Sequence, residues 1–399
     1  MAANFYLSSH ANYHLHPRGQ VVAARVEDLK HATEQEIAWI EIWSATGEPA
    51  AIQKICKRLG LRQQVSATAI VFFRRFYLRN SYCETDCPLV AAACCYVAAK
   101  AEETPVHVKS ATGEARAVFN EMGLTSFTND HTKIAEMEFY LIEELDFHLI
   151  VFHPYRALVQ LCGRDGGRQS GGEGGRAARA AMLDMDDTAL QMAWFVINDT
   201  FRTSLCLIYP PHLIAIAAIY MATSLHPPPN LFIKSSSELA VDGGSSSVIA
   251  LATGPASRTR RQSIDGGGTG PSRSIPGNSN SIGGQTDAVT FLASLNVDHT
   301  IVLEIVQEIV SLYDLWNALE TAPPLSNAAA TATVGPTVFG AKSKTGGVGA
   351  AKNGSPAGLA GGGNADERIL ATLTRMRIAR HQELQMDRER GKGTPSWKR

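Results

Sequence analysis

Two charged residues with apolar neighbours in the sequence have the right chemistry to hold a partner. Lys100 directly follows the most apolar run of the chain, residues 89–99, and Glu138 lies four residues after Ile134 at the edge of an apolar stripe. Lysine is rarely fully buried without a partner, so Lys100 could be a cation held at the rim of a helical bundle for a partner, and Glu138 is a second candidate. There are simpler alternatives. Lys100 could only cap its own helix, since a cation there meets the last carbonyls and the helix dipole. Glu138 could be a partly exposed surface carboxylate.

Motifs of common catalytic and metal sites are absent from the sequence. No G-x-x-x-x-G-K-[ST], G-x-S-x-G or H-E-x-x-H string occurs. His10, His14 and His16 are close together, but no carboxylate or thiolate completes a site, which predicts a solvated terminal segment. Adjacent acids such as Glu102 and Glu103 point roughly 100° apart on a helix, which is typical of a solvated face. We therefore expect no catalytic residue, no metal and no cofactor.

Composition excludes several classes of protein. The chain has 399 residues, which allows two or three domains, and 45% of them are hydrophobic. Its 37 Lys and Arg balance 38 Asp and Glu, which argues against direct nucleic-acid binding. Seven cysteines without a C-x-x-C pair predict buried thiols in a reducing intracellular compartment. The polar N-terminus predicts no secretory signal, and no apolar run reaches the roughly 18–20 residues of a membrane span.

Glycine divides the chain into compact blocks and flexible segments. Of 34 glycines, 27 fall in the windows 163–181, 234–290 and 322–365. Segments rich in glycine and serine bury too little apolar area to offset the entropy lost on ordering. We therefore expect these windows to be flexible insertions or linkers.

Between the windows the hydrophobic period is helical. Thr33 and Glu36 form a capping box that opens a helix. Apolar residues recur every three or four positions from Val65 to Phe76, and again from Ile134 to Leu145 after an expected cap at Asn129. Strand signals are sparse and no β-α-β alternation appears, so the predicted fold class is all-α.

An internal repeat predicts two tandem helical domains. Residues 89–99 align with residues 213–223 at an offset of 124, and Tyr96 and Tyr220 are among the identities. Two alanine-rich helices could align by chance. The upstream helix also matches at the same offset, and this favours duplication of a helical unit around one buried helix.

Several strings resemble the cyclin family. Residues 61–69 and 73–77 resemble the first helix of a cyclin box, residues 99–103 the end of its third helix, and residues 136–141 its fifth. More narrowly, the chain is similar to the cyclin C group, the cyclins of the Mediator kinase module. The strings that carry this similarity lie at 4–10, 152–156, 198–202, 205–212 and 312–316.

The resemblance implies two tandem five-helix cyclin boxes with an N-terminal helical segment. The expected divisions are an N-terminal segment at 1–34, a first box at 35–150, a second box at 151–320 with insertions at 163–181 and 234–290, a flexible linker at 321–365, and a charged tail at 366–399 that could be helical.

The resemblance also implies a function and a site. In cyclins, a lysine and a glutamate at the positions of Lys100 and Glu138 grip the backbone of the kinase's regulatory helix, and the apolar neighbours here would be Val97, Ile142 and Leu149. The expected role is a non-catalytic nuclear subunit that activates the Mediator cyclin-dependent kinase, contacts other Mediator subunits and acts on RNA polymerase II indirectly. Two alternatives remain: a cyclin of another transcriptional kinase, and a cyclin-fold factor similar to transcription factor IIB.

Overall fold

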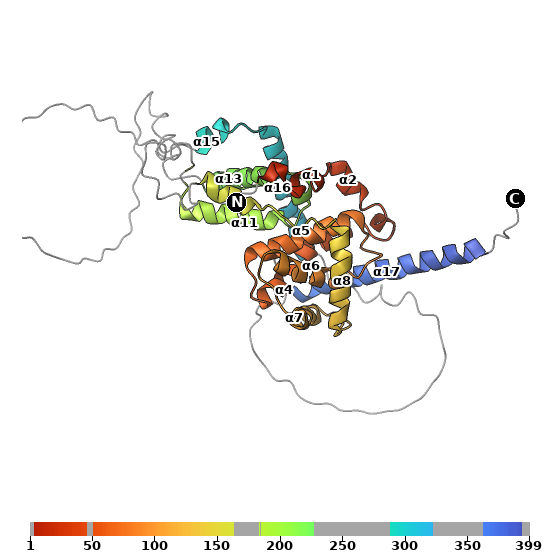
Figure 1. Ribbon diagram of the computed structural model, residues 1–399. Helices are drawn as coiled ribbons and strands as arrows, with labels where there is room; N and C mark the ends of the chain where they lie inside the picture. The colour runs from red at the N-terminus through yellow and green to blue at the C-terminus, as the bar shows by residue number, and fades with distance from the viewer. Residues whose placement is uncertain are drawn as a thin grey trace, which may run out of the picture.

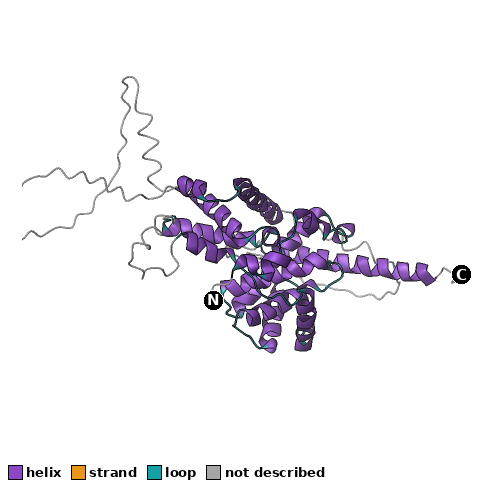
Figure 2. Cartoon of the chain, turned by 45° about the horizontal axis from the view of Figure 1, so that its top comes forward, coloured by secondary structure: helices purple, strands orange, loops and turns teal. Residues whose placement is uncertain are grey.

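The computed structural model describes residues 4–45, 51–162, 183, 185–226, 288–321 and 362–392. Every regular element within these ranges is a helix (Figures 1 and 2), which confirms the all-α class. The expected flexible segments lie outside the described residues, with small exceptions. Helix α15 begins at Ala288, α16 ends at Thr321 and α17 begins at Gly362.

Short helices precede the first box. They are η1 (Phe5–Leu7), α1 (Ser9–Tyr13), α2 (Arg18–Ala23), η2 (Asp28–Lys30) and α3 (Glu34–Ala45). The capping box at the start of α3 is confirmed, because the Glu36 amide donates to Thr33 Oγ1 at 3.2 Å and the Thr33 amide donates to Glu36 Oε2 at 2.9 Å.

The first box is built around one buried helix. Its five helices are α4 (Ala51–Arg58), α5 (Gln63–Arg79), α6 (Cys87–Ala101), α7 (Val108–Glu121) and α8 (His131–Glu144). Helix α6 packs against the other four, as its apolar surface on nearly all sides requires. Because α4 comes first, residues 63–79 form the second helix of the box and not the first. The cap of α8 is also Asp130 rather than Asn129, since Asp130 Oδ1 accepts the Thr132 amide at 2.9 Å.

The second box repeats this arrangement around α13. Its helices are α9 (Pro154–Leu161), α11 (Asp187–Thr200), the short α12 (Leu205–Ile208), α13 (Pro211–Leu225), α15 (Ala288–Ser294) and α16 (His299–Thr321). Helix α13 packs against α9, α11, α15 and α16, as α6 does against its four neighbours. Helices α11 and α13 begin 124 residues after α5 and α6, which confirms the duplication.

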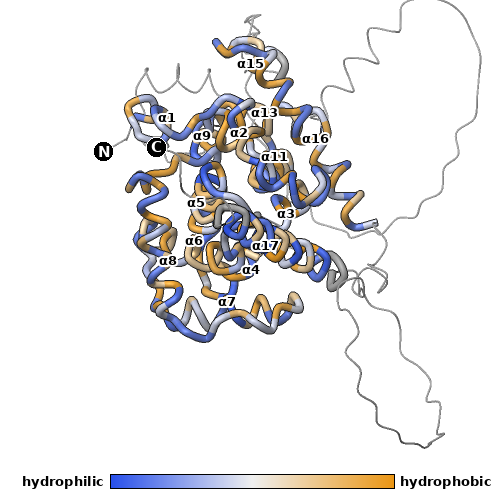
Figure 3. Tube along the Cα trace, turned by 90° about the vertical axis from the view of Figure 1, so that its right-hand side faces the viewer, coloured by the Kyte–Doolittle hydropathy of each residue, from blue (hydrophilic) through white to orange (hydrophobic). Residues whose placement is uncertain are grey.

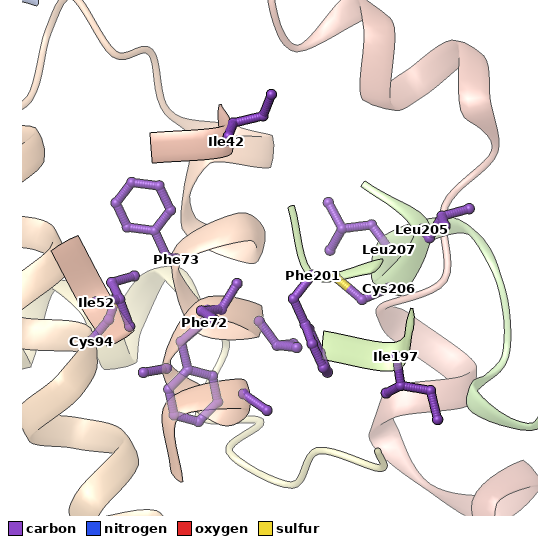
Figure 4. Packing of buried hydrophobic residues seen from close by; sticks show 14 of the residues in the cluster. Ile42, Ile52, Phe72, Phe73, Cys94, Ile197, Phe201, Leu205, Cys206 and Leu207 are labelled. Carbon is purple, nitrogen blue, oxygen red and sulfur yellow. The ribbon is translucent and has the colours of Figure 1, made fainter. Parts of the chain in front are cut away.

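One hydrophobic core continues from the first box into the second. Figure 4 shows Phe72 and Phe73 of α5 on one side of the boundary, and Phe201, Leu205 and Leu207 on the other. Continuity of the core across the boundary makes the two boxes a single packed unit.

The N-terminal histidines are not solvated, contrary to the sequence prediction. His10 is 2% exposed and His14 is 4% exposed. His10 Nδ1 accepts the Phe152 amide at 3.0 Å, and His14 Nε2 lies 3.2 Å from His148 Nδ1. The partners come from the segment that joins the boxes, more than 130 residues away, so local sequence gave no sign of them.

The charged tail contains a long helix, α17 (Gly362–Lys392), that returns to the first box and packs against α3. Its far half projects beyond the box in Figure 1, and Figure 3 shows hydrophilic residues interspersed with hydrophobic ones along it. None of the described helices has the length and hydropathy of a membrane span.

Candidate partner-binding site

Helices α6 and α8 bring Lys100 and Glu138 into direct contact. Lys100 lies in the last turn of α6, and its Nζ donates to Glu138 Oε1 on α8 at 2.6 Å. The lysine side chain is 42% exposed and the glutamate 14% exposed. The two residues that sequence analysis selected from separate helices therefore form one surface ion pair.

A third side chain, Tyr96, holds the lysine in place. Lys100 Nζ lies 4.2 Å from the centre of the Tyr96 ring, one helical turn earlier. Partial burial lowers the pKa of Lys100, but the hydrogen bonds to Glu138 and Tyr96 outweigh this and raise it. The lysine is therefore a cation at neutral pH with a defined position, held between a carboxylate and an aromatic face.

The three expected apolar neighbours differ in how accessible they are. Val97 is 1% exposed and lies inside the core, so it supports the site from beneath and offers no surface to a partner. Ile142 and Leu149 are half-buried and pack against the core, which leaves part of each at the surface. Tyr96, one residue before Val97, is half-buried and reaches the surface beside Lys100. Because α6 is apolar on nearly all sides, the sequence gave no signal that Tyr96 and not Val97 would reach the surface.

Four exposed apolar residues on α8 and just after it escaped the sequence analysis. Phe139 is 75% exposed and Tyr140 57% exposed on α8, and Phe147 and Ile150 are 74% and 62% exposed just after it. A run of large apolar side chains left in solvent is a common mark of a protein interface. A signal did exist: Phe139 and Tyr140 fall outside the apolar stripe that contains Ile134 and Leu141.

Backbone strain flanks the same surface. Glu103, just after α6, has φ 55°, and Asp146 and Phe147, just after α8, have φ 52° and 60°. A bulky residue in the left-handed region is costly and persists where surrounding structure holds it. Arg79 pairs with Asp146 and donates to the Glu144 carbonyl at 2.9 Å, which fixes this turn and presents Phe147 outward.

The arrangement suits recognition more than catalysis. Among the described residues, no group of three or more His, Cys, Asp or Glu side chains is placed to hold a metal ion. The ion pair joins a donor and an acceptor beside large apolar surfaces. Such a surface can bind the polar backbone at a helix end while burying apolar side chains next to it.

The class of this protein follows from the fold and from a match to a known family. Residues 50–150 match the family described as "Cyclin, N-terminal domain". The matched range covers α4 to α8, and the second box repeats its architecture. The protein is a cyclin of two boxes.

Curated relatives place the chain within the cyclins. It is 36% identical over 376 residues to the RNA polymerase II holoenzyme cyclin-like subunit of Mycosarcoma maydis, with 80% of this chain and 91% of that protein covered. It is 35% identical over 263 residues to the protein of that name from Emericella nidulans, with 66% and 74% covered. The chain belongs to the family of RNA polymerase II holoenzyme cyclin-like subunits.

A solved structure with a similar chain is that of the yeast TFIIK (Kin28/Ccl1/Tfb3) complex. The similarity covers 58% of this chain and 91% of that chain, at 22% identity and a TM-score of 0.42. The family assignment above rests on the sequence relatives.

Proposed function

We propose that this chain is the regulatory subunit of the Mediator-associated cyclin-dependent kinase. In this role it binds the kinase's regulatory helix and holds it where the kinase's own Lys–Glu ion pair forms. Family membership supports a cyclin of the RNA polymerase II machinery. The observation that carries the proposal is the preformed Lys100–Glu138 pair beside four exposed apolar side chains.

Physical chemistry supports this use of the surface. Both charged groups are held by packed helices, so little side-chain entropy is lost when a partner arrives. Burying a large apolar side chain contributes about 1.5–3 kcal/mol, so Phe139 and Phe147 together could supply several kcal/mol to an interface. The charged pair would set the register of the partner helix, and the apolar residues would supply most of the affinity.

The wider role follows from the same proposal. The complex would act in the nucleus, with the carboxy-terminal domain of RNA polymerase II as a substrate of the bound kinase. The chain would contact other Mediator subunits, reach the polymerase only through the complex, and contribute no catalytic group, cofactor or metal. It would bind neither nucleic acid nor membrane directly.

Two alternatives predict different partners. A cyclin of another transcriptional kinase would use the same surface with a different kinase. A factor similar to transcription factor IIB would bind DNA with a strong salt dependence, for which a net charge of -1 is poorly suited.

Affinity capture from nuclear extract tests the proposal. The full chain, the Lys100→Ala and Glu138→Ala variants, and a Ser224→Ala control are used as bait, and co-purifying kinases are identified by mass spectrometry. We expect the Mediator kinase with the full chain and the control, and at least about 30-fold less with the two variants. Capture of a different kinase would support the first alternative, and salt-sensitive capture of DNA without a kinase would support the second. The purified chain alone should show no phosphotransfer.

A further inference from the structure

Helix α17 lies on the first box by one apolar face. Asp366 of α17 is buried and pairs with Lys54 of α4 at 3.6 Å. Four apolar side chains of α17 are buried as well, at spacings of one, three and three residues: Ile369, Leu370, Leu373 and Met376. They form one stripe of a helix, and the helix packs against α3. On α3, Trp39 meets the Arg368 guanidinium, which lies 4.8 Å from the ring centre. We call the surface under α17, formed by α3 and the turn at 84–86, the α17 seat.

Acidic residues form the rim of the α17 seat and arginines of α17 pair with them. Three of the ion pairs of α17 link it to α3 and to the turn at 84–86: Arg375–Glu36 at 2.7 Å, Arg377–Asp86 at 3.3 Å and Arg380–Glu84 at 2.7 Å. Most of these side chains are substantially exposed, so each pair contributes little net stability and is weakened by salt. The pairs therefore contribute more to the specificity for a basic helix than to the free energy of its binding.

Helix α17 leaves two clefts beside it unfilled. A cleft of about 490 Å³ remains on one flank of α17, lined by apolar residues of the first box that include Leu89, Leu124 and Phe127. A second cleft of about 750 Å³ lies between α17 and the turn at Cys83 and Glu84. Both clefts are open to solvent, so the surface at the edge of the seat is only partly covered by α17.

The buried side chains of α17 end at Met376. Beyond it the described side chains are at least partly exposed, including Ile378 at 54% and Met386 at 52%, although ion pairs such as Arg380–Glu84 still link this part to the box. Four buried apolar side chains, the buried Asp366 and mostly exposed ion pairs hold a helix of 31 residues. Such an element lies at the low-stability end of a fold, from which local opening takes place.

We propose that the α17 seat is a docking site for an arginine-bearing amphipathic helix of a partner protein, and that α17 is its built-in competitor. The partner helix carries apolar residues spaced like those of α17, flanked by arginines that match Glu36, Glu84 and Asp86. It displaces α17 because it can also fill the flanking clefts. Since α17 is tethered to the same chain, its high effective concentration makes the seat selective for partners that bind better than α17 does.

The seat is separate from the Lys100–Glu138 surface along α6. Asp86 caps the N-terminal end of α6, whereas Lys100 lies in its last turn. A partner at the seat and a kinase at the ion pair would therefore meet opposite ends of one buried helix. The inference does not rest on the proposed function, and its test uses no kinase.

A labelled peptide of residues 362–392 serves as the probe in the test. It is titrated against the full chain, against a full chain with Leu373→Asp and Met376→Asp to release α17, and against a matched control with Ile378→Asp and Met386→Asp on exposed positions of the same helix. We expect the released chain to bind the probe at least about 10-fold more tightly than the unaltered chain or the control. Reversing Arg375 and Arg380 to Glu in the probe should abolish binding. A released chain that also carries Glu36→Arg and Glu84→Arg should restore it.

Several outcomes would overturn the proposal. Equal binding of the probe to unaltered and released chains would place the probe elsewhere. A folded released chain that does not bind the probe would make α17 an inseparable part of the core. Self-association of the unaltered chain that the release substitutions abolish would assign the seat to exchange of α17 between two copies.

Hydrogen exchange on the unaltered chain covers the case in which the released variant does not fold. Amides of residues 369–376 should exchange at least about 100-fold faster than those of α6, because α17 opens without global unfolding. Exchange of both helices at the same rate would reject a displaceable α17.

Discussion

The two boxes share a scaffold and differ at the C-terminal ends of their central helices. Helices α6 and α13 each lie at the centre of a box and pack against four neighbours. At the offset of 124 residues, Tyr96 corresponds to Tyr220, but Lys100 corresponds to Ser224, whose hydroxyl donates to the Tyr220 carbonyl at 2.7 Å. The same architecture therefore ends in an ion pair between two helices in the first box. In the second box the equivalent side chain only bonds to the backbone of its own helix.

The last helix of each box shows the same contrast. Helix α8 buries Ile134 and Leu141, and α16 buries Val302 and Ile309 at the same spacing of seven. Aligning these pairs places half-buried Val306 at the position of Glu138. The second box thus lacks both members of the charged pair. The residues that the boxes share are those that pack in their cores, and the charged pair belongs to the first box only.

Opposite charges also occupy one equivalent position at the boundary between the boxes. Arg75 of α5 corresponds to Asp199 of α11. Burial lowers the pKa of Arg75 to about 10, and burial raises the pKa of Asp199. Tyr313 donates to Asp199 at 3.0 Å, whereas Arg75 donates to the His148 carbonyl at 3.2 Å. The first box therefore holds its buried cation with a backbone carbonyl, and the second holds its carboxylate with a tyrosine hydroxyl.

The largest effect should come from the charged pair. Lys100→Ala and Glu138→Ala should each weaken kinase binding by about 2–5 kcal/mol while leaving the cyclin folded, because truncation leaves the other charge unpaired in the interface. Ser224→Ala, the second-box counterpart, should leave affinity unchanged. Titration of the captured kinase and thermal unfolding are measured on the same variants. If Lys100 only caps α6, its variant will lose about 0.3–1 kcal/mol of stability and bind the kinase normally.

Acid should destabilise the protein through His10 and His14 of the N-terminal segment and His153 at the junction of the boxes. Burial, and then the nearby Arg75 charge, lower the pKa of His10 to about 2, and the same causes lower those of His14 and His153 to about 3. Unfolding restores values near 6.5, so the unfolded chain takes up more protons as pH falls below 6.5. The free energy of unfolding should therefore be highest above that pH and fall below it, by up to about 1.4 kcal/mol per histidine and pH unit.

Matched variants test this acid dependence. His10→Asn keeps an acceptor for the Phe152 amide, and His153→Gln keeps a partner for Thr68. Each should flatten the change in urea midpoint between pH 7.5 and 5.5. His107→Asn, at an exposed helix cap, should not. If the change in urea midpoint with pH is the same in the first two variants as in the unaltered chain, these histidines do not cause the acid dependence.

Overpacking should cost the same in both boxes if their central helices are equivalent. Ala93 and Ala217 occupy matching positions, and each is 0% exposed. Ala93→Leu and Ala217→Leu should each lower the free energy of unfolding by about 1–3 kcal/mol, because a close helix contact must widen. Chemical denaturation measures both. A large loss in one variant and none in the other would show that the packing of the boxes has diverged.

The smallest expected difference lies at the caps of α5 and α11. Asp186 Oδ1 accepts the Ala189 amide at 3.0 Å, whereas Arg62, the equivalent cap of α5, makes no side-chain capping bond. Asp186→Ala should therefore cost about 1 kcal/mol of stability, and Arg62→Ala should cost less than about 0.5 kcal/mol. Equal losses in thermal unfolding would show that the cap geometry does not distinguish the two helices.

Local sequence was sufficient for the helices, the repeat and the charged pair. Helix starts depend on neighbours a few residues away, as at Thr33 and Glu36, and the duplicated pattern is readable because the buried small residues of α6 and α13 must be kept. Lys100 and Glu138 stood out because each is a charge beside an apolar run. Their roles came from resemblance to cyclins, and their contact is a property of the packed helices.

Tertiary structure decided which faces are buried and what covers them. Val97 and Tyr96 are adjacent in an apolar helix, and only the positions of the surrounding helices put Val97 in the core and Tyr96 under Lys100. His10 is buried because Phe152 arrives from the far end of the first box. Helix α17 lies where it does because acidic residues from α3 and from the turn at 84–86 come together and pair with its arginines. Each of these outcomes depends on contacts between segments distant in the chain, which periodicity and spacing do not encode.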